Sequence, residues 1–183
     1  MPPAVQAALI AAAVAIIGWY VTYAYTKRRE DRARRIEIQV KYRQRQIEEL
    51  YGPLVSLIEE LFNVWSVREN ILGETSERYS PEQGEHIREF VWKNYLHPIH
   101  QEIGSLLRTK LYLLEGGRTP SSLAEYLQHA TQEECQHRLW DDFQLDTSHA
   151  KPREFPDDFY EDIKGTLQRL MSEYQAGLAD LRN

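Results

Sequence analysis

Hydrophobic and polar positions divide the chain into an uncharged apolar beginning and a long series of helical stripes. Residues 4–26 carry no charged side chain and are followed at once by the basic stretch 27–35. At about 1.5 Å per residue this segment makes a helix of roughly 34 Å, long enough to cross a hydrocarbon core of about 30 Å. The pattern therefore predicts a transmembrane anchor over residues 1–26.

The apolar positions of the anchor continue into the next segment on the same helix face, at intervals that alternate between three and four residues. Such a repeat is typical of a parallel coiled coil, and small residues one turn apart let transmembrane helices approach closely. We expect a helical stalk over residues 27–50 and a homo-oligomer. Alternatively, the stripe from Ile47 onward is the core face of a bundle helix, because further apolar positions widen it. The predicted interface residues are Ala8, Ala12, Ala15, Ile36, Val40, Ile47 and Leu50.

Gly52 and Pro53 interrupt the pattern, because proline removes a backbone donor and clashes with the preceding turn. We predict a hinge there, either a kink or a short break. The surrounding stretch Glu49-Leu50-Tyr51-Gly52-Pro53-Leu54 resembles a pattern in uncharacterised bacterial single-pass membrane proteins. The resemblance covers the first third of the chain. It implies an anchor followed by a charged helix, and no activity.

Cap signals predict where the next helices begin. Ser80 and Pro81, followed by Gln83, have the pattern of a capping box with proline at the first helical position. A helix is therefore expected from Pro81. Pro98 predicts a kink or a restart within it.

Further signals divide the rest of the chain. Gly116-Gly117 predicts a helix end, Thr119-Pro120 a new helix to about Asp142, and Pro156 the start of the last helix. Strand alternation is missing from the sequence. We therefore predict an all-α protein: a transmembrane helix continuing into a long juxtamembrane helix, then an antiparallel bundle of about four helices over residues 51–183.

The charge distribution predicts the orientation. The net charge is −6, yet residues 27–45 hold nine Lys and Arg against three acidic residues. The basic residues follow the apolar run instead of preceding it, which favours a retained anchor over a cleaved signal peptide. The positive-inside rule puts the N-terminus outside and the body in the cytoplasm, at the inner (plasma) membrane. The predicted membrane-interface residues are Trp19, Tyr20, Tyr23, Lys27, Arg28 and Arg29.

The charge of the body and the number of cysteines limit the expected partners and the expected compartment. An acidic body argues against nucleic-acid binding, since phosphate contacts need a basic face. The single cysteine, Cys135, cannot form an internal disulfide, as expected in a reducing compartment.

Candidate chemistry is sparse. Glu134 and His137 stand at i, i+3, a spacing that brings a carboxylate and an imidazole onto one helix face, and Glu133 lies beside them. Di-iron bundles need two such motifs and two further glutamates, and this chain has one. A metal site, if there is one, would depend on Glu134 and His137. We predict none.

The other histidines give no ligand set by spacing. His97 and His100 flank a proline and lack the further ligands of a zinc site, so we expect them to form interhelical hydrogen bonds. His86, His129 and His149 are isolated in the sequence. We predict no catalytic residue and no cofactor.

The expected function is therefore binding. P-loop, GxGxxG and GxSxG patterns are missing from the sequence. We predict a membrane-anchored cytoplasmic interaction domain, acting as an oligomeric scaffold, sensor or effector and not as an enzyme. The expected partners are the lipid bilayer and a second copy, with another protein as a further candidate, but not nucleic acid. Two alternatives stay open: a metal-dependent enzyme using Glu133, Glu134 and His137, and an accessory subunit of a larger membrane complex.

Overall fold

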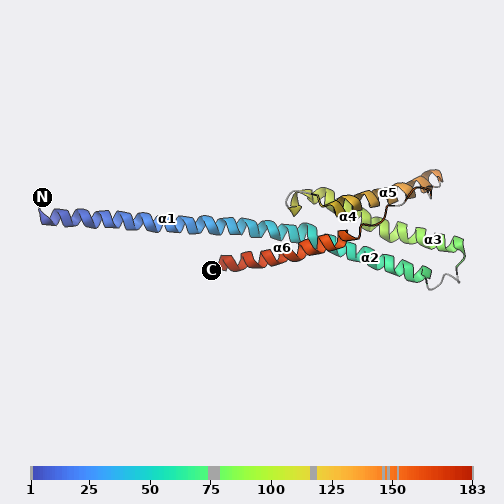
Figure 1. Cartoon of the computed structure of the whole chain (residues 1–183), viewed down its shortest axis with the longest axis horizontal. Helices are drawn as coiled ribbons and strands as arrows, with labels where there is room; N and C mark the ends of the chain where they lie inside the picture. The colour runs from blue at the N-terminus through green and yellow to red at the C-terminus, as the bar shows by residue number, and fades with distance from the viewer. Residues whose placement is uncertain are drawn as a thin grey trace. The chain divides into compact units, whose positions relative to one another are not determined.

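The structure is a computed structural model that describes residues 2–73, 79–115, 119–145, 147, 149–151 and 153–182, except for the side chains of residues 7–10. The chain is helical along most of these ranges and forms no strand in them, which confirms the all-α class (Figure 1). The helices are α1 (Pro3–Gln46), α2 (Gly52–Gly73), α3 (Pro81–Val91), α4 (His97–Lys110), α5 (Ser121–Phe143) and α6 (Asp158–Arg182). Two π-helical turns, η1 (Ile47–Tyr51) and η2 (Trp92–Leu96), and a 3-10 turn, η3 (Leu111–Leu113), complete the elements.

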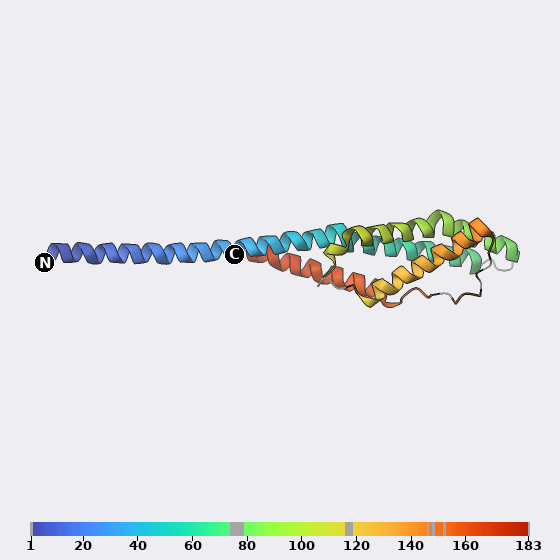
Figure 2. The same ribbon diagram turned by 90° about the horizontal axis from the view of Figure 1, so that it is seen from above.

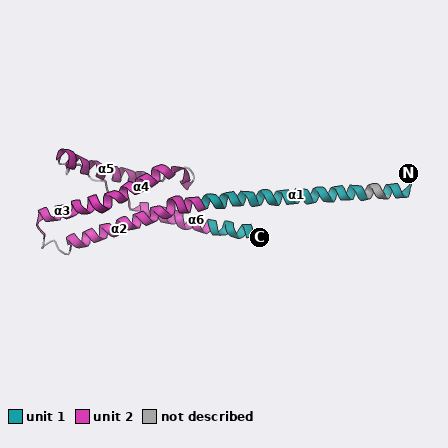
Figure 3. Ribbon diagram, turned by 180° about the vertical axis from the view of Figure 1, so that it is seen from behind, with its two compact units in different colours: residues 1–43, 173–183 teal, residues 44–172 magenta. Residues whose placement is uncertain are grey.

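The chain divides into two compact units (Figure 3). The first comprises residues 1–43 and 173–183, which belong to α1 and to the end of α6. The second comprises residues 44–172. The predicted division into anchor, stalk and body did not anticipate that the end of α6 groups with the stalk.

In the first unit, the end of α6 packs closely on α1. Val40 is 5% exposed, and its Cγ2 lies so near Gly177 that a Cβ on that glycine would meet it at 2.6 Å. The Arg43 guanidinium donates to the Glu173 carboxylate at 2.9 Å. A glycine is needed here because any larger residue would force the two helices apart.

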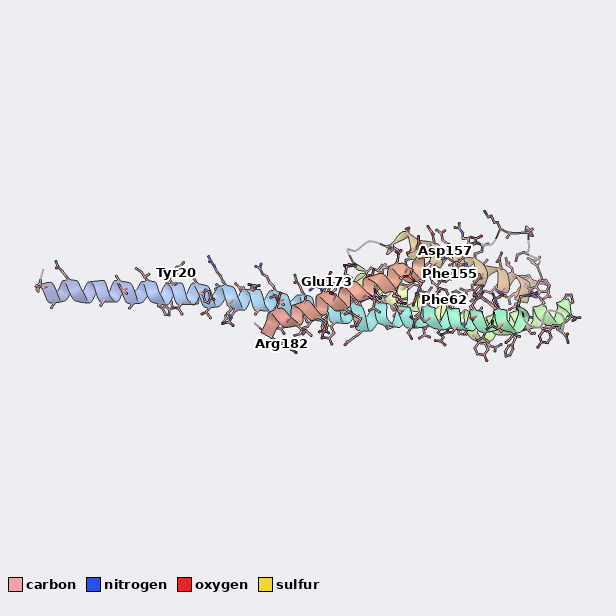
Figure 4. The ribbon with its side chains drawn as sticks, turned by 60° about the horizontal axis from the view of Figure 1, so that its bottom comes forward. Tyr20, Phe62, Phe155, Asp157, Glu173 and Arg182 are labelled. Atoms are coloured by element: carbon pink, nitrogen blue, oxygen red, sulfur yellow. The ribbon has the colours of Figure 1, made fainter. Side chains whose placement is uncertain are left out.

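The first half of α1 is long and apolar enough, by length and composition, to cross a membrane. Large apolar side chains along it are exposed, including Ile16 at 66% and Tyr20 at 65%, the latter labelled in Figure 4. The Trp19 and Tyr23 rings stack at 5.7 Å, and the Lys27 ammonium lies 5.8 Å from the Tyr23 ring centre.

In the second unit, α2 and α3 lie side by side and contact each other, as Figures 1 and 2 show. The apolar stripe of α2 supplies Leu54 and Ile58, which are fully buried. They join one hydrophobic core with residues of α4, α5 and α6, so the alternative interpretation of the stripe as a core face is confirmed for this part. The other fully buried large side chains are Leu50, Ile103, Leu107, Leu113, Leu123, Tyr126, Phe159, Ile163 and Leu170.

Two of the prolines that lie in helices follow a π-turn, which ends two residues before them. η1 precedes Pro53, and η2 precedes Pro98. At the first of these turns, the N–H of Gly52 donates to the carbonyl of Ile47, the longer span of a π-helix. The extra residue in the turn lets the helix accommodate a proline that has no N–H to donate. The expected hinge at Gly52-Pro53 is therefore a wide turn within a continuous helix, not a break.

The predicted helix starts agree with the structure. Ser80 and Gln83 form the capping box, with hydrogen bonds of 3.2 and 2.9 Å. α5 spans almost the predicted range, and the last helix begins two residues after Pro156. Gly116-Gly117 lies outside the described residues.

Candidate functional site

Two helices of the second unit bring two imidazoles and a carboxylate together. His100 comes from α4, while His129 and Glu133 lie one turn apart on the same face of α5. The Glu133 Oε2 lies 3.6 Å from Nε2 of His100 and 3.6 Å from Nε2 of His129. The three potential ligand atoms all lie within 4.8 Å of one another. We call these three residues the His/Glu cluster.

The second nitrogen of each imidazole also has a partner. His100 Nδ1 lies 2.9 Å from the Tyr126 hydroxyl, and His129 Nδ1 lies 2.6 Å from the main-chain carbonyl of Arg153. The latter belongs to the connection between α5 and α6. These hydrogen bonds orient both rings so that their Nε2 atoms face Glu133.

Aromatic side chains surround the cluster. Phe155, from the same connection, packs its ring edge-on against His129 at 5.6 Å and against Phe62 of α2 at 5.4 Å. Figure 4 labels both phenylalanines. His100 and His129 are 7% and 8% exposed, whereas the Glu133 side chain is 36% exposed. The cluster is thus buried on its imidazole side and reachable on its carboxylate side.

The bond to the Arg153 carbonyl determines the tautomer of His129. A carbonyl oxygen only accepts hydrogen bonds, so Nδ1 must carry the hydrogen. In the neutral imidazole, Nε2 then presents a lone pair to the Glu133 carboxylate. Two acceptors therefore face each other, and only a proton or a cation between them makes this arrangement favourable.

Burial disfavours charge on two members of the cluster, His100 and Glu133. It lowers the pKa of His100 to about 3, and the neighbouring His129 and His97 imidazoles contribute to this shift. Burial raises the pKa of Glu133, against the opposing charges of His129 and Arg68. It also raises the pKa of Tyr126, which therefore stays a neutral hydroxyl. The imidazole of His100 is thus neutral at physiological pH, the form that binds metals.

The structure does not bring the predicted pair Glu134 and His137 into the cluster. Glu134 forms an ion pair with Arg138 at 2.8 Å, and the His137 ring stacks on Trp92 at 4.3 Å. Burial lowers the pKa of His137.

Two of the other histidines behave differently from each other. The interhelical hydrogen bond expected of His100 is confirmed by its contact with Tyr126. His97 Nε2, in contrast, is buried and has no hydrogen-bond partner among the described residues. His129 is isolated in sequence but not in space. The signal that sequence reasoning missed was its i, i+4 spacing to Glu133.

The predicted oligomer seam needs correction. The structure buries Val40 against α6 and Leu50 in the core of the second unit, so neither offers an exposed surface to another copy. Ile47 packs partly on the same core. Ala12 and Ala15 are exposed on α1 and Ile36 is half-buried, while the side chain of Ala8 lies outside the described part. The predicted membrane-interface residues Trp19, Tyr20, Tyr23, Lys27, Arg28 and Arg29 are all exposed.

An apolar groove of about 790 Å³ lies between α2 and α3. Several of its apolar side chains are exposed, with Val67 at 56%, Phe90 at 57% and Tyr95 at 50%. We call it the α2/α3 groove. Its lining residues are Asn63, Val64, Val67, Ile71, Tyr79, His86, Ile87, Phe90, Val91 and Tyr95.

No protein-family model, no characterised protein and no solved structure matches the chain.

Proposed function

We propose that the chain is a single-pass protein of the inner (plasma) membrane whose cytoplasmic helical domain works by binding, as an oligomeric scaffold, sensor or effector. The observation that carries this proposal is the exposed apolar surface of α1. Large apolar side chains such as Ile16 and Ile17, at 66% and 62% exposure, cover several successive turns. Exposing such a surface to water is unfavourable, whereas burying it in the hydrocarbon core of a bilayer is favourable.

The residues at the end of this surface support the orientation. Trp19, Tyr20 and Tyr23 have amphipathic rings suited to the headgroup level, and basic residues follow directly. The N-terminus is then outside and the body cytoplasmic.

Protease digestion of sealed vesicles tests this orientation. We expect added protease to remove the body in inside-out vesicles and to leave it intact in right-side-out vesicles. The opposite pattern would reverse the topology. Extraction of the chain by carbonate would instead argue against an anchor.

The α2/α3 groove supports the binding role. Contiguous exposed apolar surface on a folded domain usually marks an interaction site. We assign a second copy of the chain as its occupant, because anchoring confines all copies to one membrane in one orientation. Such confinement raises their effective concentration and makes a modest apolar contact sufficient.

Single-cysteine crosslinking in native membranes tests self-association. Cys135 is exposed and is the only native cysteine, so Cys135→Ser gives a clean background. Ala15→Cys probes the anchor, Val67→Cys probes the groove, and Glu60→Cys, exposed on α2 outside the groove lining, is the control. We expect dimers from the first two and few from the control.

The products also distinguish other modes of binding. Equal dimer yields at all three positions would contradict the assigned interface. A crosslinked product that joins the chain to a different protein would favour an accessory subunit of a larger membrane complex.

A further inference from the structure

We propose that His100, His129 and Glu133 bind a divalent first-row transition metal ion, for which Zn²⁺ is the best match. This site is independent of the anchor and the groove. It also differs from the pair Glu134 and His137 on which the sequence would base a metal site.

The first argument comes from hydrogen-bond roles. The Arg153 carbonyl, 2.6 Å from His129 Nδ1, obliges this nitrogen to donate, so in the neutral imidazole Nε2 offers its lone pair to the Glu133 carboxylate at 3.6 Å. That separation is too long for a direct hydrogen bond. A metal ion accepts lone pairs from both groups at once and turns an unfavourable contact into coordination.

The second argument comes from the ligand types. Two imidazoles and one carboxylate are the protein ligands of many catalytic zinc sites, which keep a fourth position open. Bond lengths near 2.0–2.1 Å in a tetrahedron place neighbouring ligand atoms about 3.3 Å apart. The observed 3.6 Å from Glu133 Oε2 to each Nε2 is close to that spacing, and the three ligand atoms all lie within 4.8 Å of one another. Side-chain shifts can close the remaining difference.

The third argument is the outer hydrogen-bond shell. Metal-binding histidines usually donate their other N–H to an oxygen, which fixes ring orientation and increases basicity. Both imidazoles have such a partner: the Tyr126 hydroxyl for His100 and the Arg153 carbonyl for His129.

Besides His129, Arg68 is the charged side chain that acts on Glu133, and its guanidinium is engaged elsewhere. Its guanidinium pairs with Glu69 at 3.0 Å and lies over the Trp65 ring at 5.8 Å. The carboxylate of Glu133 thus keeps its capacity to bind a cation. The competing explanation is a proton shared within the cluster, with no metal, and the experiment must separate these two.

The test uses the full chain, purified in detergent through a tag without histidines and stripped with a chelator. Zn²⁺ is titrated in competition with a chromophoric chelator, and Co²⁺ is added separately to record its visible absorption. We expect one Zn²⁺ per chain and the intense visible bands of low-coordinate Co²⁺.

The variants are Glu133→Gln, which nearly preserves shape, and His129→Ala. Loss of an outer hydrogen-bond partner lowers metal affinity about 10- to 100-fold. Each of these two variants alters a ligand itself and should lower the Zn²⁺ affinity by more than that. Glu134→Gln, on the next residue of α5, and Glu60→Gln, exposed on α2, are the matched controls and should bind Zn²⁺ like the original chain. Circular dichroism confirms that each variant is folded.

Two results would overturn the proposal. One is the absence of stoichiometric Zn²⁺ binding by the folded chain, which would leave the shared proton as the explanation. The other is binding that survives Glu133→Gln unchanged or disappears equally in the controls.

Discussion

Nδ1 of His129, on α5, lies 2.6 Å from the main-chain carbonyl oxygen of Arg153, a residue of the connection between α5 and α6. A second bond in the same region runs from the Gln132 amide to the carbonyl of Lys151 at 2.9 Å. The connection is thus attached to the helix face that carries the His/Glu cluster. Whatever binds His129 Nε2 acts on the Nδ1–H as well, because coordination makes that hydrogen a stronger donor.

Zn²⁺ should therefore protect the connection from hydrogen exchange. Metal binding and docking of the connection stabilise each other by the same free energy, since coupling is reciprocal. We expect slower exchange in residues 149–157 on Zn²⁺ addition, measured by mass spectrometry. Residues 81–91 of α3 serve as the internal control. Equal protection of both segments would indicate general stabilisation and contradict the specific link.

Tyr126→Phe should weaken metal binding without abolishing it. The substitution removes the hydroxyl 2.9 Å from His100 Nδ1 and leaves that nitrogen unsatisfied in a buried position. We expect about 10- to 100-fold lower Zn²⁺ affinity and a loss of about 1–3 kcal/mol in stability. Zn²⁺ titration and chemical denaturation measure the two effects. An unchanged affinity would show that Tyr126 does not orient His100.

Gly52→Ala should destabilise the second unit, although alanine normally favours helices. A Cβ at this position would lie 2.7 Å from the main-chain oxygen of Ile47, within the π-turn. We expect a loss of about 1–3 kcal/mol, as in overpacked sites. Gly165→Ala on α6 is the control: its Cβ would meet nothing within 4 Å, and the substitution should add about 0.5–1 kcal/mol. Urea denaturation of both variants measures the two effects. If both substitutions stabilised the chain, the close contact within the π-turn would be contradicted.

Gly177→Ala should separate α6 from α1 within the first unit, because its Cβ would meet Val40 Cγ2 at 2.6 Å. A matching deletion, Val40→Ala, creates the space that the new methyl group needs. We expect the double variant to be more stable than the sum of the single effects implies, by about 0.5–3 kcal/mol. Simple additivity in thermal unfolding would contradict the close contact.

Acid should weaken the ion pairs of Glu49. Hydrogen bonds from Arg45 and Lys110 lower the pKa of the Glu49 carboxyl from 4.5 to about 2. The unfolded chain therefore binds the proton first, so the contribution to stability is present above pH 4.5 and is lost as the pH falls through 2.

Glu49→Gln removes this contribution at any pH. We expect the difference in unfolding free energy between the original chain and this variant to shrink from pH 6 towards pH 2, as measured by denaturant titration across that range. Glu60→Gln, exposed on α2, should show no such trend. A difference that grows towards low pH would contradict the assigned direction.

Local signals in the sequence were sufficient for most helix boundaries. Ser80, Pro81 and Gln83 predict a helix start because a cap depends only on residues within one turn. The helix from Ser121 to Phe143 lies close to its predicted range, although Pro120 is its N-cap and no side chain caps it. The π-turns were not predicted. Proline indicates that the backbone must adjust, but not whether it does so by a break or by an inserted residue.

The sequence by itself determined the uncharged helix at the start of the chain, the basic residues that follow it, and the all-α class, because periodicity and charge are properties of neighbouring residues. Only the tertiary structure decided which residues of α1 are buried by their own chain, as Val40 is by Gly177. It also decided that His100 meets His129 and Glu133. The i, i+4 spacing puts His129 and Glu133 on one helix face, but their meeting with His100 depends on how α4 packs on α5, which the residues around a single histidine do not determine.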